Sequence, residues 1–347
     1  MRKVVDLSVL VTGGAGFIGS HVVDKLVTMG RKVCVLDNLS TGLLENLRHH
    51  VEGGSVDFVE GDVQDGELVE KLVKNVDGVV HLAAVTSVPF SVEHPLLTNK
   101  VNVEGTLNLL NACLDGDVQR FLFVSSCAVY GEPCYFPIDE RHPVCPLSPY
   151  AASKLAAEYY CRAFGRSYGL ETVVLRPFNV YGPRQRREDM YSGVITRFFE
   201  NLFSGRPLVV YGDGSQTRDF VHVFDVAEAV WLALNVKDAG GQVFNVAYGR
   251  SVRISELAKT LVELVGNHVE ITYEAARVSD LKHSLADIAK VRESLGYKPK
   301  ISLEIGLQGL LDQWKEEAAA DQSVSVHDFR QLEKTEQGLR SFALRNW

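Results

Sequence analysis

The first forty residues contain an apolar run, a glycine-rich turn and a helical pattern in that order. Residues 7–12 are apolar and end at Gly13-Gly14-Ala15-Gly16-Phe17-Ile18-Gly19, after which residues 20–29 have helical spacing. Glycines allow a tight turn, close approach of a pyrophosphate to backbone N–H groups, and close packing of helix on strand. We therefore predict a strand, turn and helix that bind a dinucleotide; a glycine-rich turn without a ligand is the alternative.

A second apolar run, residues 32–36, ends at Asp37. This acid follows the glycines by about 20 residues, the distance at which a carboxylate accepts hydrogen bonds from the adenosine ribose. The same carboxylate would repel a 2′-phosphate. Asp37 therefore predicts NAD as the cofactor in preference to NADP.

Strands and helices continue to alternate along the chain. Further apolar runs at 56–59, 78–82 and 119–124 end in polar or small residues, and helical stretches lie near 67–74 and 97–114. This pattern predicts an α/β fold, a Rossmann-type doubly wound parallel sheet whose ligands lie at the carboxyl ends of the strands. Beyond about residue 180 the alternation weakens, which predicts a smaller, discontinuous substrate lobe. The expected parts are an NAD-binding domain at 1–179 completed by about 221–247, a substrate lobe at 180–220 and 248–315, and a polar tail at 316–347.

A tyrosine and a lysine lie one helical turn apart at the predicted start of another helix. Ser148 suits the N-cap and Pro149 the first helical position, so Tyr150 and Lys154 project from the same face. An ammonium beside a phenol favours the phenolate, and we expect Lys154 to lower the pKa of Tyr150 from about 10. Tyr150 then serves as a general base, although such a pair also arises by chance on many helices.

Composition excludes several other functions. The 347 residues carry 36 Lys and Arg against 44 Asp and Glu, a net charge of −8, so we expect no binding to nucleic acid or to an anionic membrane. The six cysteines are scattered without metal-ligand spacing, and no apolar run spans a membrane. We expect free thiols, a cytoplasmic location, and no metal site, with the histidines in structural roles and His49 and His50 on the surface.

Seven motifs occur in an order that resembles a known family. They are Thr12–Gly19, Asp37–Gly42, His81–Ala84, Ser125–Gly131, Tyr150-x-x-x-Lys154, Arg176–Pro183 and Gly212–Asp219. Up to about Trp314 the chain resembles the extended short-chain dehydrogenases/reductases of the nucleotide-sugar epimerase/dehydratase group, and within it the UDP-N-acetylglucosamine and UDP-glucose 4-epimerases. The resemblance implies a Rossmann fold, bound NAD and a nucleotide-sugar substrate.

This resemblance implies roles for individual residues. Ser126, Tyr150 and Lys154 correspond to the catalytic set, with Ser126 bonded to the reacting sugar oxygen and Lys154 also on the nicotinamide ribose. Related dehydratases and decarboxylases carry acids just after the serine or threonine, where this chain has Cys127 and Ala128, so epimerisation is favoured over elimination. The cofactor contacts implied are Gly13, Gly16, Phe17, Ile18, Gly19, Asp37, Asn38, Ser40, Thr41, Gly42, Asp62, Val63, Leu82, Ala83, Ala84, Asn102, Ser125, Tyr150, Lys154 and Pro177.

The substrate side follows from the same resemblance. Asn179, Arg218 and Arg277 match positions that bind UDP, and two arginines suit a diphosphate. The small Ser284 occupies the position beside the hexose, and Ser87 lies in a segment that lines this region. Together they favour 2-acetamido sugars, such as UDP-GlcNAc and UDP-GalNAc, with plain UDP-hexoses as further substrates.

Two other interpretations remain open at this stage. A UDP-uronic acid would fit if an arginine at 184, 186 or 187 met its carboxylate. A non-catalytic NAD-binding redox sensor is a more distant alternative. By resemblance we also expect a homodimer paired through the Tyr150 helix and the helix at 97–114.

Overall fold

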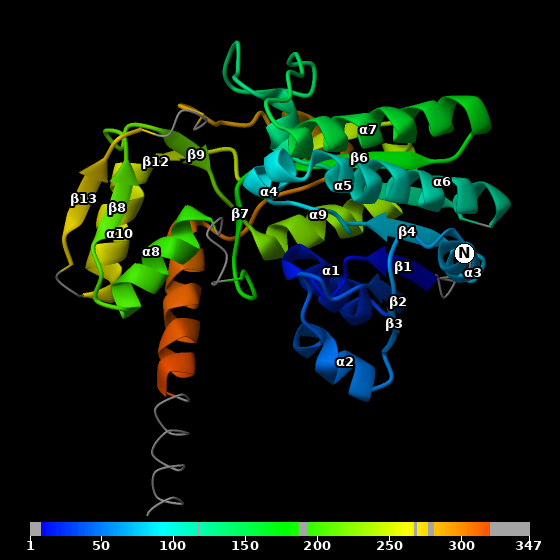
Figure 1. Ribbon diagram of the computed structural model, residues 1–347, viewed down its shortest axis with the longest axis horizontal. Helices are drawn as coiled ribbons and strands as arrows, with labels where there is room; N and C mark the ends of the chain where they lie inside the picture. The colour runs from blue at the N-terminus through cyan, green and yellow to red at the C-terminus, as the bar shows by residue number, and fades with distance from the viewer. Residues whose placement is uncertain (1–7, 117, 187–192, 267–268, 277–280, 320–347) are drawn as a thin grey trace, which may run out of the picture. The chain divides into compact units, whose positions relative to one another are not determined.

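The computed structural model describes residues 8–116, 118–186, 193–266, 269–276 and 281–319 (Figure 1). Two compact units divide the chain, residues 1–303 and residues 304–347. In the second unit residues 304–319 are helical, and most of the predicted polar tail lies outside the described residues. None of the helices in the described part of the chain has the length and apolar character needed to cross a bilayer.

A seven-stranded parallel sheet forms the centre of the first unit, in the order β11-β6-β5-β4-β1-β2-β3. The alternation of strands and helices in the sequence is thereby confirmed as a doubly wound Rossmann-type fold. The strand order reverses between β1 and β4, which both pair with their neighbours in parallel register. Crevices at such a reversal bind ligands at the carboxyl ends of the strands. The strands are β1 Ser8–Thr12, β2 Lys32–Asp37, β3 Val56–Glu60, β4 Gly78–His81, β5 Arg120–Val124, β6 Thr172–Pro177 and β11 Val243–Val246.

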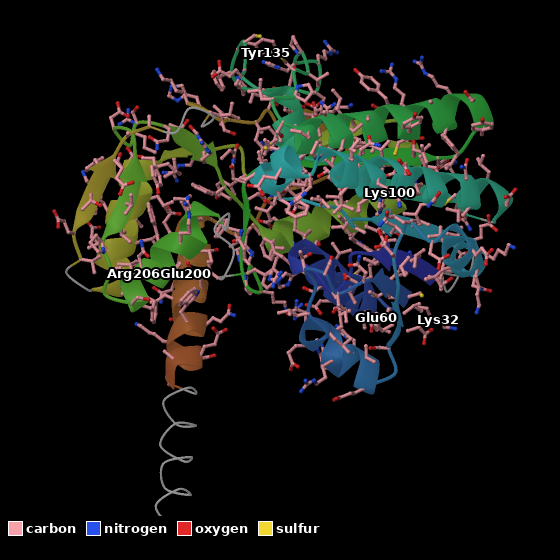
Figure 2. The ribbon with its side chains drawn as sticks, viewed as in Figure 1. Lys32, Glu60, Lys100, Tyr135, Glu200 and Arg206 are labelled. Atoms are coloured by element: carbon pink, nitrogen blue, oxygen red, sulfur yellow. The ribbon has the colours of Figure 1, made fainter. Side chains whose placement is uncertain are left out.

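Helices cover both faces of this sheet because successive side chains along a strand point to opposite faces. Val9 and Val11 pack into one core with α1 (Phe17–Thr28) and α9 (Val223–Asn235). Leu10 packs into the other core, with α3 (Gly66–Val73), α6 (Gly105–Asp115) and α7 (Pro149–Tyr168). Charged side chains such as Lys32 and Glu60 lie at the exposed ends of strands (Figure 2).

Short strands and helices make up the segments that were predicted as a discontinuous substrate lobe. β7 (Val180–Tyr181) pairs with β10 (Val221–His222), β9 (Thr217–Asp219) with β12 (Ser251–Arg253), and β8 (Leu208–Tyr211) with β13 (Ile271–Glu274). These pairs join segments far apart in the sequence, as expected for excursions from the main sheet. The helices here are α8 (Val194–Phe203) and α10 (Ile254–Val265). The exact domain boundaries stay a prediction, since residues 1–303 form one compact unit.

The segment predicted as one helix at 97–114 is built from three parts. α5 (Pro95–Asn99) continues into a π-helical turn, Lys100–Glu104, and then into α6. A π-turn inside a helix often marks a functional site. The remaining helices are α2 (Arg48–Glu52), α4 (Val88–Glu93), α11 (Ala289–Leu295) and the 3₁₀ turns Leu44–Leu47, Cys127–Tyr130 and Lys237–Ala239.

Candidate active site

The glycine turn after β1 is sterically closed to any side chain. Gly13 has a φ of +71°, and a Cβ there would lie 2.7 Å from the backbone nitrogen of Ala83. A Cβ on Gly19 would lie 2.0 Å from the carbonyl oxygen of Gly13. The N-cap of α1, Gly16, provides no side-chain cap, and the first turn, which holds Phe17 and Ile18, carries no acid. Its N–H groups are therefore suited to an anion such as a pyrophosphate.

Asp37 supports this turn as well as ending β2. Its Oδ2 accepts a hydrogen bond from the Ala15 N–H at 2.9 Å, and its Oδ1 accepts one from the Leu39 N–H at 2.9 Å. Burial raises the pKa of this carboxyl, while the two backbone hydrogen bonds lower it. Each oxygen keeps a second lone pair for a ribose hydroxyl. The role of Asp37 in bracing the glycine turn was not anticipated from the sequence.

The loop after Asp37 connects to the end of β3. Asn38 donates from Nδ2 to Asp62 Oδ2 at 2.7 Å, and Asn38 Oδ1 accepts from the Ser40 N–H at 3.0 Å. Gly42 lies against Ala15, where a Cβ would come within 2.9 Å of the alanine methyl group. The structure thus brings the predicted cofactor residues Asn38, Ser40, Thr41, Gly42 and Asp62 to one edge of the glycine turn. Val63 is buried, packed against Gly105.

The switch point between β1 and β4 holds the next group of predicted cofactor residues. Leu82 donates its N–H to Thr12 O at 3.1 Å, and Ala83 donates to Thr12 Oγ1 at 3.3 Å, so this strand end and Ala84 follow the glycine turn closely. Ser125 follows β5, and its N–H donates to Leu175 O at 2.8 Å. The buried Ser125 hydroxyl makes no hydrogen bond within the described residues. An orphaned hydroxyl at the carboxyl end of a strand in this sheet fits a bound dinucleotide.

Asn102 lies behind this crevice, in the π-helical turn. Its Oδ1 accepts from the Val85 N–H at 2.7 Å, while its Nδ2 donates to Val85 O at 3.0 Å and to Ser153 Oγ at 2.8 Å. The side chain is 1% exposed. Asn102 therefore fixes the loop after β4 against α7, and its direct contact with the cofactor stays a prediction.

The predicted catalytic residues converge at the start of α7. Ser148 caps this helix by accepting from the Ala151 N–H at 3.1 Å, and Pro149 is its first residue. The Tyr150 N–H donates to Ser91 Oγ at 3.0 Å. Ser126 follows the end of β5 by two residues; its Oγ accepts from the Ala128 N–H at 3.2 Å, and its hydroxyl lies close enough to Tyr150 to lower the pKa of the phenol. The structure thus brings a hydroxyl and a phenol near each other, and their roles in proton transfer stay a prediction.

Lys154 is buried on α7, one helical turn after Tyr150. Its Nζ donates to Val124 O at 2.9 Å and lies 4.7 Å from the centre of the Phe123 ring. Burial lowers the pKa of the Lys154 ammonium to about 8. A lysine with this pKa loses much of its charge just above neutral pH.

The expected effect of Lys154 on Tyr150 is wrong for the protein alone. Burial raises the pKa of Tyr150 to about 12, and the hydrogen bond from Ser126 only partly offsets this. The ammonium of Lys154 is directed to the Val124 carbonyl and the Phe123 ring instead of the phenol. Depth of burial, which spacing on a helix does not reveal, decides the direction.

A cavity of about 260 Å³ brings together two residues predicted to bind UDP. Asn179 donates from Nδ2 to Asp219 O at 3.1 Å, and Arg218 donates from Nη1 to Leu281 O at 2.6 Å. Arg277 lies outside the described residues. Sequence reasoning missed other residues that line this cavity, among them Arg197, Tyr211, Gln216 and Phe220.

Asp219 anchors the region where Ser284 lies. Its carboxylate, fully buried, accepts hydrogen bonds from the N–H groups of Tyr248, Gly249 and Ala286 at 3.1–3.2 Å. Burial raises the pKa of Asp219 to about 6, against these hydrogen bonds. Ser284, two residues before Ala286, is 5% exposed. Ser87 caps α4 by accepting from the Phe90 N–H at 3.3 Å, and the contact of either serine with a sugar stays a prediction.

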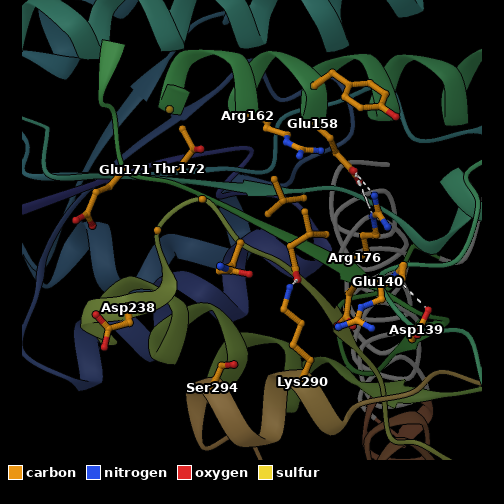
Figure 3. A pocket seen from close by; sticks show the side chains of 18 of the residues that line it. Asp139, Glu140, Glu158, Arg162, Glu171, Thr172, Arg176, Asp238, Lys290 and Ser294 are labelled. Atoms are coloured by element: carbon orange, nitrogen blue, oxygen red, sulfur yellow. Dashed lines mark hydrogen bonds and ion pairs between the residues drawn. The ribbon is translucent and has the colours of Figure 1, made fainter. Parts of the chain in front are cut away.

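A larger cavity of about 1260 Å³ lies beside α7 and β11, and none of the predicted site residues line it (Figure 3). A buried ion pair lies in the wall of this cavity. Arg176 donates from Nε to Glu158 Oε1 at 2.9 Å and from Nη2 to Oε2 at 2.5 Å. Its lining mixes acids and bases, so neither charge dominates, and we place the chemistry at Tyr150 instead.

Comparison with known proteins agrees with this geometry. The sequence profile of the NAD dependent epimerase/dehydratase family matches residues 9–247. The chain belongs to this family. NAD is accordingly its cofactor, and the cradle described above fits it.

Relatives within the family include several sugar-nucleotide enzymes. A putative UDP-glucose 4-epimerase of Methanocaldococcus jannaschii is 42% identical over 309 residues, 88% of this chain and 98% of the relative. The structure of a UDP-N-acetylglucosamine 4-epimerase from Methanobrevibacter ruminantium, solved with UDP-N-acetylmuramic acid, is 40% identical with a TM-score of 0.86, covering 90% of this chain and 99% of that one. A UDP-glucuronic acid 4-epimerase mutant from Bacillus cereus, solved with NAD and a fluorinated substrate analogue, is 30% identical with a TM-score of 0.83, covering 89% and 99%.

Proposed function

We propose that this protein is a UDP-sugar 4-epimerase that interconverts UDP-GlcNAc and UDP-GalNAc, and accepts UDP-glucose and UDP-galactose more weakly. The observation that carries the proposal is the proximity of the Ser126 hydroxyl to the Tyr150 phenol, with the buried Lys154 one helical turn further along α7. Epimerisation needs a proton acceptor, a reversible hydride acceptor and no further acid. Ser126, Tyr150 and Lys154 provide the proton acceptor and include no further acid, and NAD provides the hydride acceptor.

The reaction would proceed at the sugar C4 carbon. Tyr150, as phenolate, takes the proton of the C4 hydroxyl while Ser126 donates a hydrogen bond to the same oxygen. When bound, NAD supplies the acceptor for the C4 hydride and, in its oxidised form, a positive charge that favours the phenolate. The resulting 4-keto sugar rotates within the site, so that hydride would return to the opposite face of C4 while Tyr150 returns the proton to the C4 oxygen.

The residues after Ser126 argue against elimination. Burial raises the pKa of the Cys127 thiol to about 12, so it stays protonated and is a weak acid. Ala128 has no ionisable group. Neither side chain can protonate a leaving hydroxyl, as a dehydratase requires.

The cavity around Asn179 and Arg218 supports a nucleotide diphosphate. Its volume of about 260 Å³ lies just below the range of whole ligand pockets, about 300–1,000 Å³, so it suits one part of a UDP-sugar. Guanidinium groups bind phosphate oxygens in a bidentate manner. Arg197 lines the same cavity and adds a second candidate cation.

The acetamido sugar is favoured over a uronic acid by the state of Arg184. Its Nη1 donates to Asp24 Oδ2 at 2.8 Å, so this arginine is already engaged with a carboxylate of the protein. A small residue at Ser284 leaves room for an N-acetyl group. The relatives include both a UDP-N-acetylglucosamine 4-epimerase, 40% identical, and a putative UDP-glucose 4-epimerase, 42% identical, so the choice between these sugars rests on Ser284.

A substrate panel tests the proposal. Purified protein is incubated with UDP-GlcNAc, UDP-glucose and UDP-glucuronate, with and without added NAD, and epimers are separated by chromatography. We expect UDP-GalNAc to form fastest and without added NAD. Absence of an epimer from every UDP-hexose would refute the proposal, and fastest turnover of UDP-glucuronate would assign the uronic acid.

The Tyr150→Phe variant separates catalysis from simple NAD binding. We expect it to lose turnover while it retains NAD, because the phenol hydroxyl is removed and the glycine cradle is intact. Undiminished activity in this variant would contradict the mechanism. A non-catalytic redox sensor would instead show no epimer with the parent protein.

We also infer a homodimer paired through α5, α6 and α7. Large apolar side chains are exposed on these helices: Leu96 is 86% exposed on α5, and Tyr159 and Tyr160 are 54% and 40% exposed on α7. Such groups together mark an interaction surface. Light scattering after size exclusion should give twice the chain mass, and a monomer that is active at all concentrations would contradict the inference.

A further inference from the structure

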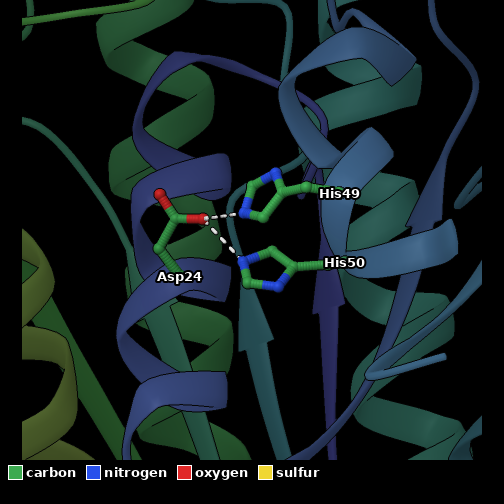
Figure 4. Close-up of side chains that lie close together, drawn as sticks. All are labelled: Asp24, His49 and His50. Carbon is green, nitrogen blue, oxygen red and sulfur yellow. Dashed lines mark hydrogen bonds and ion pairs between the residues drawn. The ribbon is translucent and has the colours of Figure 1, made fainter. Parts of the chain in front are cut away.

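Helices α1 and α2 bring one aspartate and two histidines together. The Nε2 atom of His50 lies 2.8 Å from Asp24 Oδ1, and the Nε2 atom of His49 lies 3.8 Å from the same oxygen. All three candidate ligand atoms lie within 4.8 Å of one another. Figure 4 shows both imidazole rings pointing at the carboxylate from the α2 side. Neighbouring residues of a helix do not usually face one point, so this convergence needs an explanation.

Ser55 contacts the second nitrogen of the His50 ring. Its Oγ lies 3.2 Å from His50 Nδ1 and 3.1 Å from His50 O. When the hydroxyl donates to His50 O, it accepts from Nδ1–H, and the neutral ring directs the lone pair of Nε2 toward Asp24 Oδ1. This is the tautomer that a metal ion on Nε2 requires.

We propose that Asp24, His49 and His50 form a binding site for a divalent transition-metal ion such as Zn²⁺. Imidazole nitrogen and carboxylate oxygen are ligands that such ions prefer. With metal–ligand bonds of about 2.0–2.1 Å, tetrahedral geometry places ligand atoms roughly 3.3 Å apart. The observed separations of 2.8 Å and 3.8 Å bracket this value. A small rotation of the exposed His49 ring completes the site.

Two outer contacts orient the ligands. Arg184 Nη1 binds Asp24 Oδ2 at 2.8 Å, which holds the carboxylate and leaves Oδ1 for the metal. The Ser55 contact fixes the ring of His50 in the same way. Such outer partners are typical of metal-binding histidines and carboxylates. The nearby guanidinium charge opposes a cation, so we expect a modest affinity.

The site would have a structural role. A metal ion there joins α2 to α1, the helix that begins at the glycine turn. Through Arg184 it also connects to the neighbouring Gln185, which lines the nucleotide cavity. We therefore expect bound metal to stabilise the folded protein, as any ligand of the native state does.

Metal titration of the full chain tests this site. Chelator-treated, gel-filtered protein is titrated with ZnCl₂ by calorimetry and with CoCl₂ by visible absorption. We expect one ion per chain, and a Zn²⁺-dependent rise of the thermal midpoint. His49 is 60% exposed, so His49→Ala leaves the fold intact, and we expect it to weaken binding roughly tenfold or more and to abolish the rise. His50→Gln should behave likewise.

The chain also offers a matched control variant for the metal titration. His94→Gln removes another exposed histidine, whose ring stacks on Phe90, and should leave binding unchanged. Three results would overturn the proposal: no binding of either ion by the parent, unaltered binding in His49→Ala, or a Co²⁺ spectrum with thiolate charge transfer. The first two would assign the bridge between Asp24 and His50 to a proton.

Discussion

Replacing Ser126 by alanine tests the role of Tyr150 as the base. The Ser126 hydroxyl beside the phenol lowers the pKa of Tyr150, against the burial that raises this pKa to about 12. A hydrogen bond to a charged group contributes about 1.5–3 kcal/mol. Since one pKa unit equals about 1.4 kcal/mol, the pKa of Tyr150 should rise by roughly one to two units in Ser126→Ala.

This shift has a defined effect on the rate. The phenolate is the reactive form, so at a fixed pH below the pKa its population falls by the same factor, roughly 10- to 100-fold. The assay is kcat for UDP-GalNAc formation, measured from about pH 6 to about pH 10. We expect the rising limb of the profile to move to higher pH in the variant. Loss of the bond to the substrate oxygen lowers kcat further but leaves the limb in place.

Ser125→Ala is the matched control for this measurement. Ser125 is the preceding residue, is also buried, and its hydroxyl makes no hydrogen bond within the described residues. Its removal should reduce NAD retention without moving the pH limb. An unchanged limb in Ser126→Ala, or an equal shift in both variants, would refute the assignment of Tyr150 as a base tuned by Ser126.

Four further variants test other parts of the molecule. Arg218→Met should raise KM for UDP-sugars roughly 10- to 100-fold with little change in kcat, because a charge-assisted bond to the diphosphate, remote from C4, is lost. Steady-state kinetics and calorimetric titration with UDP measure this loss of affinity. Ser284→Tyr should abolish turnover of UDP-GlcNAc while UDP-glucose is still converted, and parallel rate assays decide this. Glu158→Gln leaves the charge of Arg176 buried and should lower the free energy of unfolding by about 3–5 kcal/mol in urea titrations, whereas replacing both partners by apolar residues should recover most of it. In Asp219→Asn the pH dependence of the free energy of unfolding should flatten. Burial raises the pKa of Asp219 from 3.8 to about 6, so the parent protein has extra stability below about pH 4. It loses this stability, about 3 kcal/mol, as the pH rises through 6.

Much of the fold was predictable because its signals are local. Apolar runs of strand length, glycines at a turn, and Ser148-Pro149 at a helix start each act within a few residues. The pairs β9–β12 and β8–β13 were not predictable in this way. β12 has the half-exposed pattern of a loop, and its strand character comes from pairing with a segment over thirty residues earlier.

The candidate site shows the same contrast between local signals and long-range packing. Ser126, Tyr150 and Lys154 could be found from their motif spacing, and their catalytic roles stay a prediction. The direction of the pKa shift at Tyr150 could not, since it depends on how much chain covers the phenol. The cluster of Asp24 with His49 and His50 was missed for a related reason, because the sequence has no metal-ligand spacing there and the packing of α2 on α1 creates it.

The raised pKa of Tyr150 has a consequence for how catalysis begins. A phenol with a pKa of about 12 is protonated at neutral pH, and a lysine with a pKa of about 8 is largely charged, so the protein alone holds the pair in its inactive ionisation state. A base becomes available once another positive charge favours the phenolate, and oxidised NAD carries one. Proton abstraction is thereby linked to the presence of the hydride acceptor. For the proposed reaction, this means that the sugar hydroxyl would lose its proton when oxidised NAD is present to accept the C4 hydride.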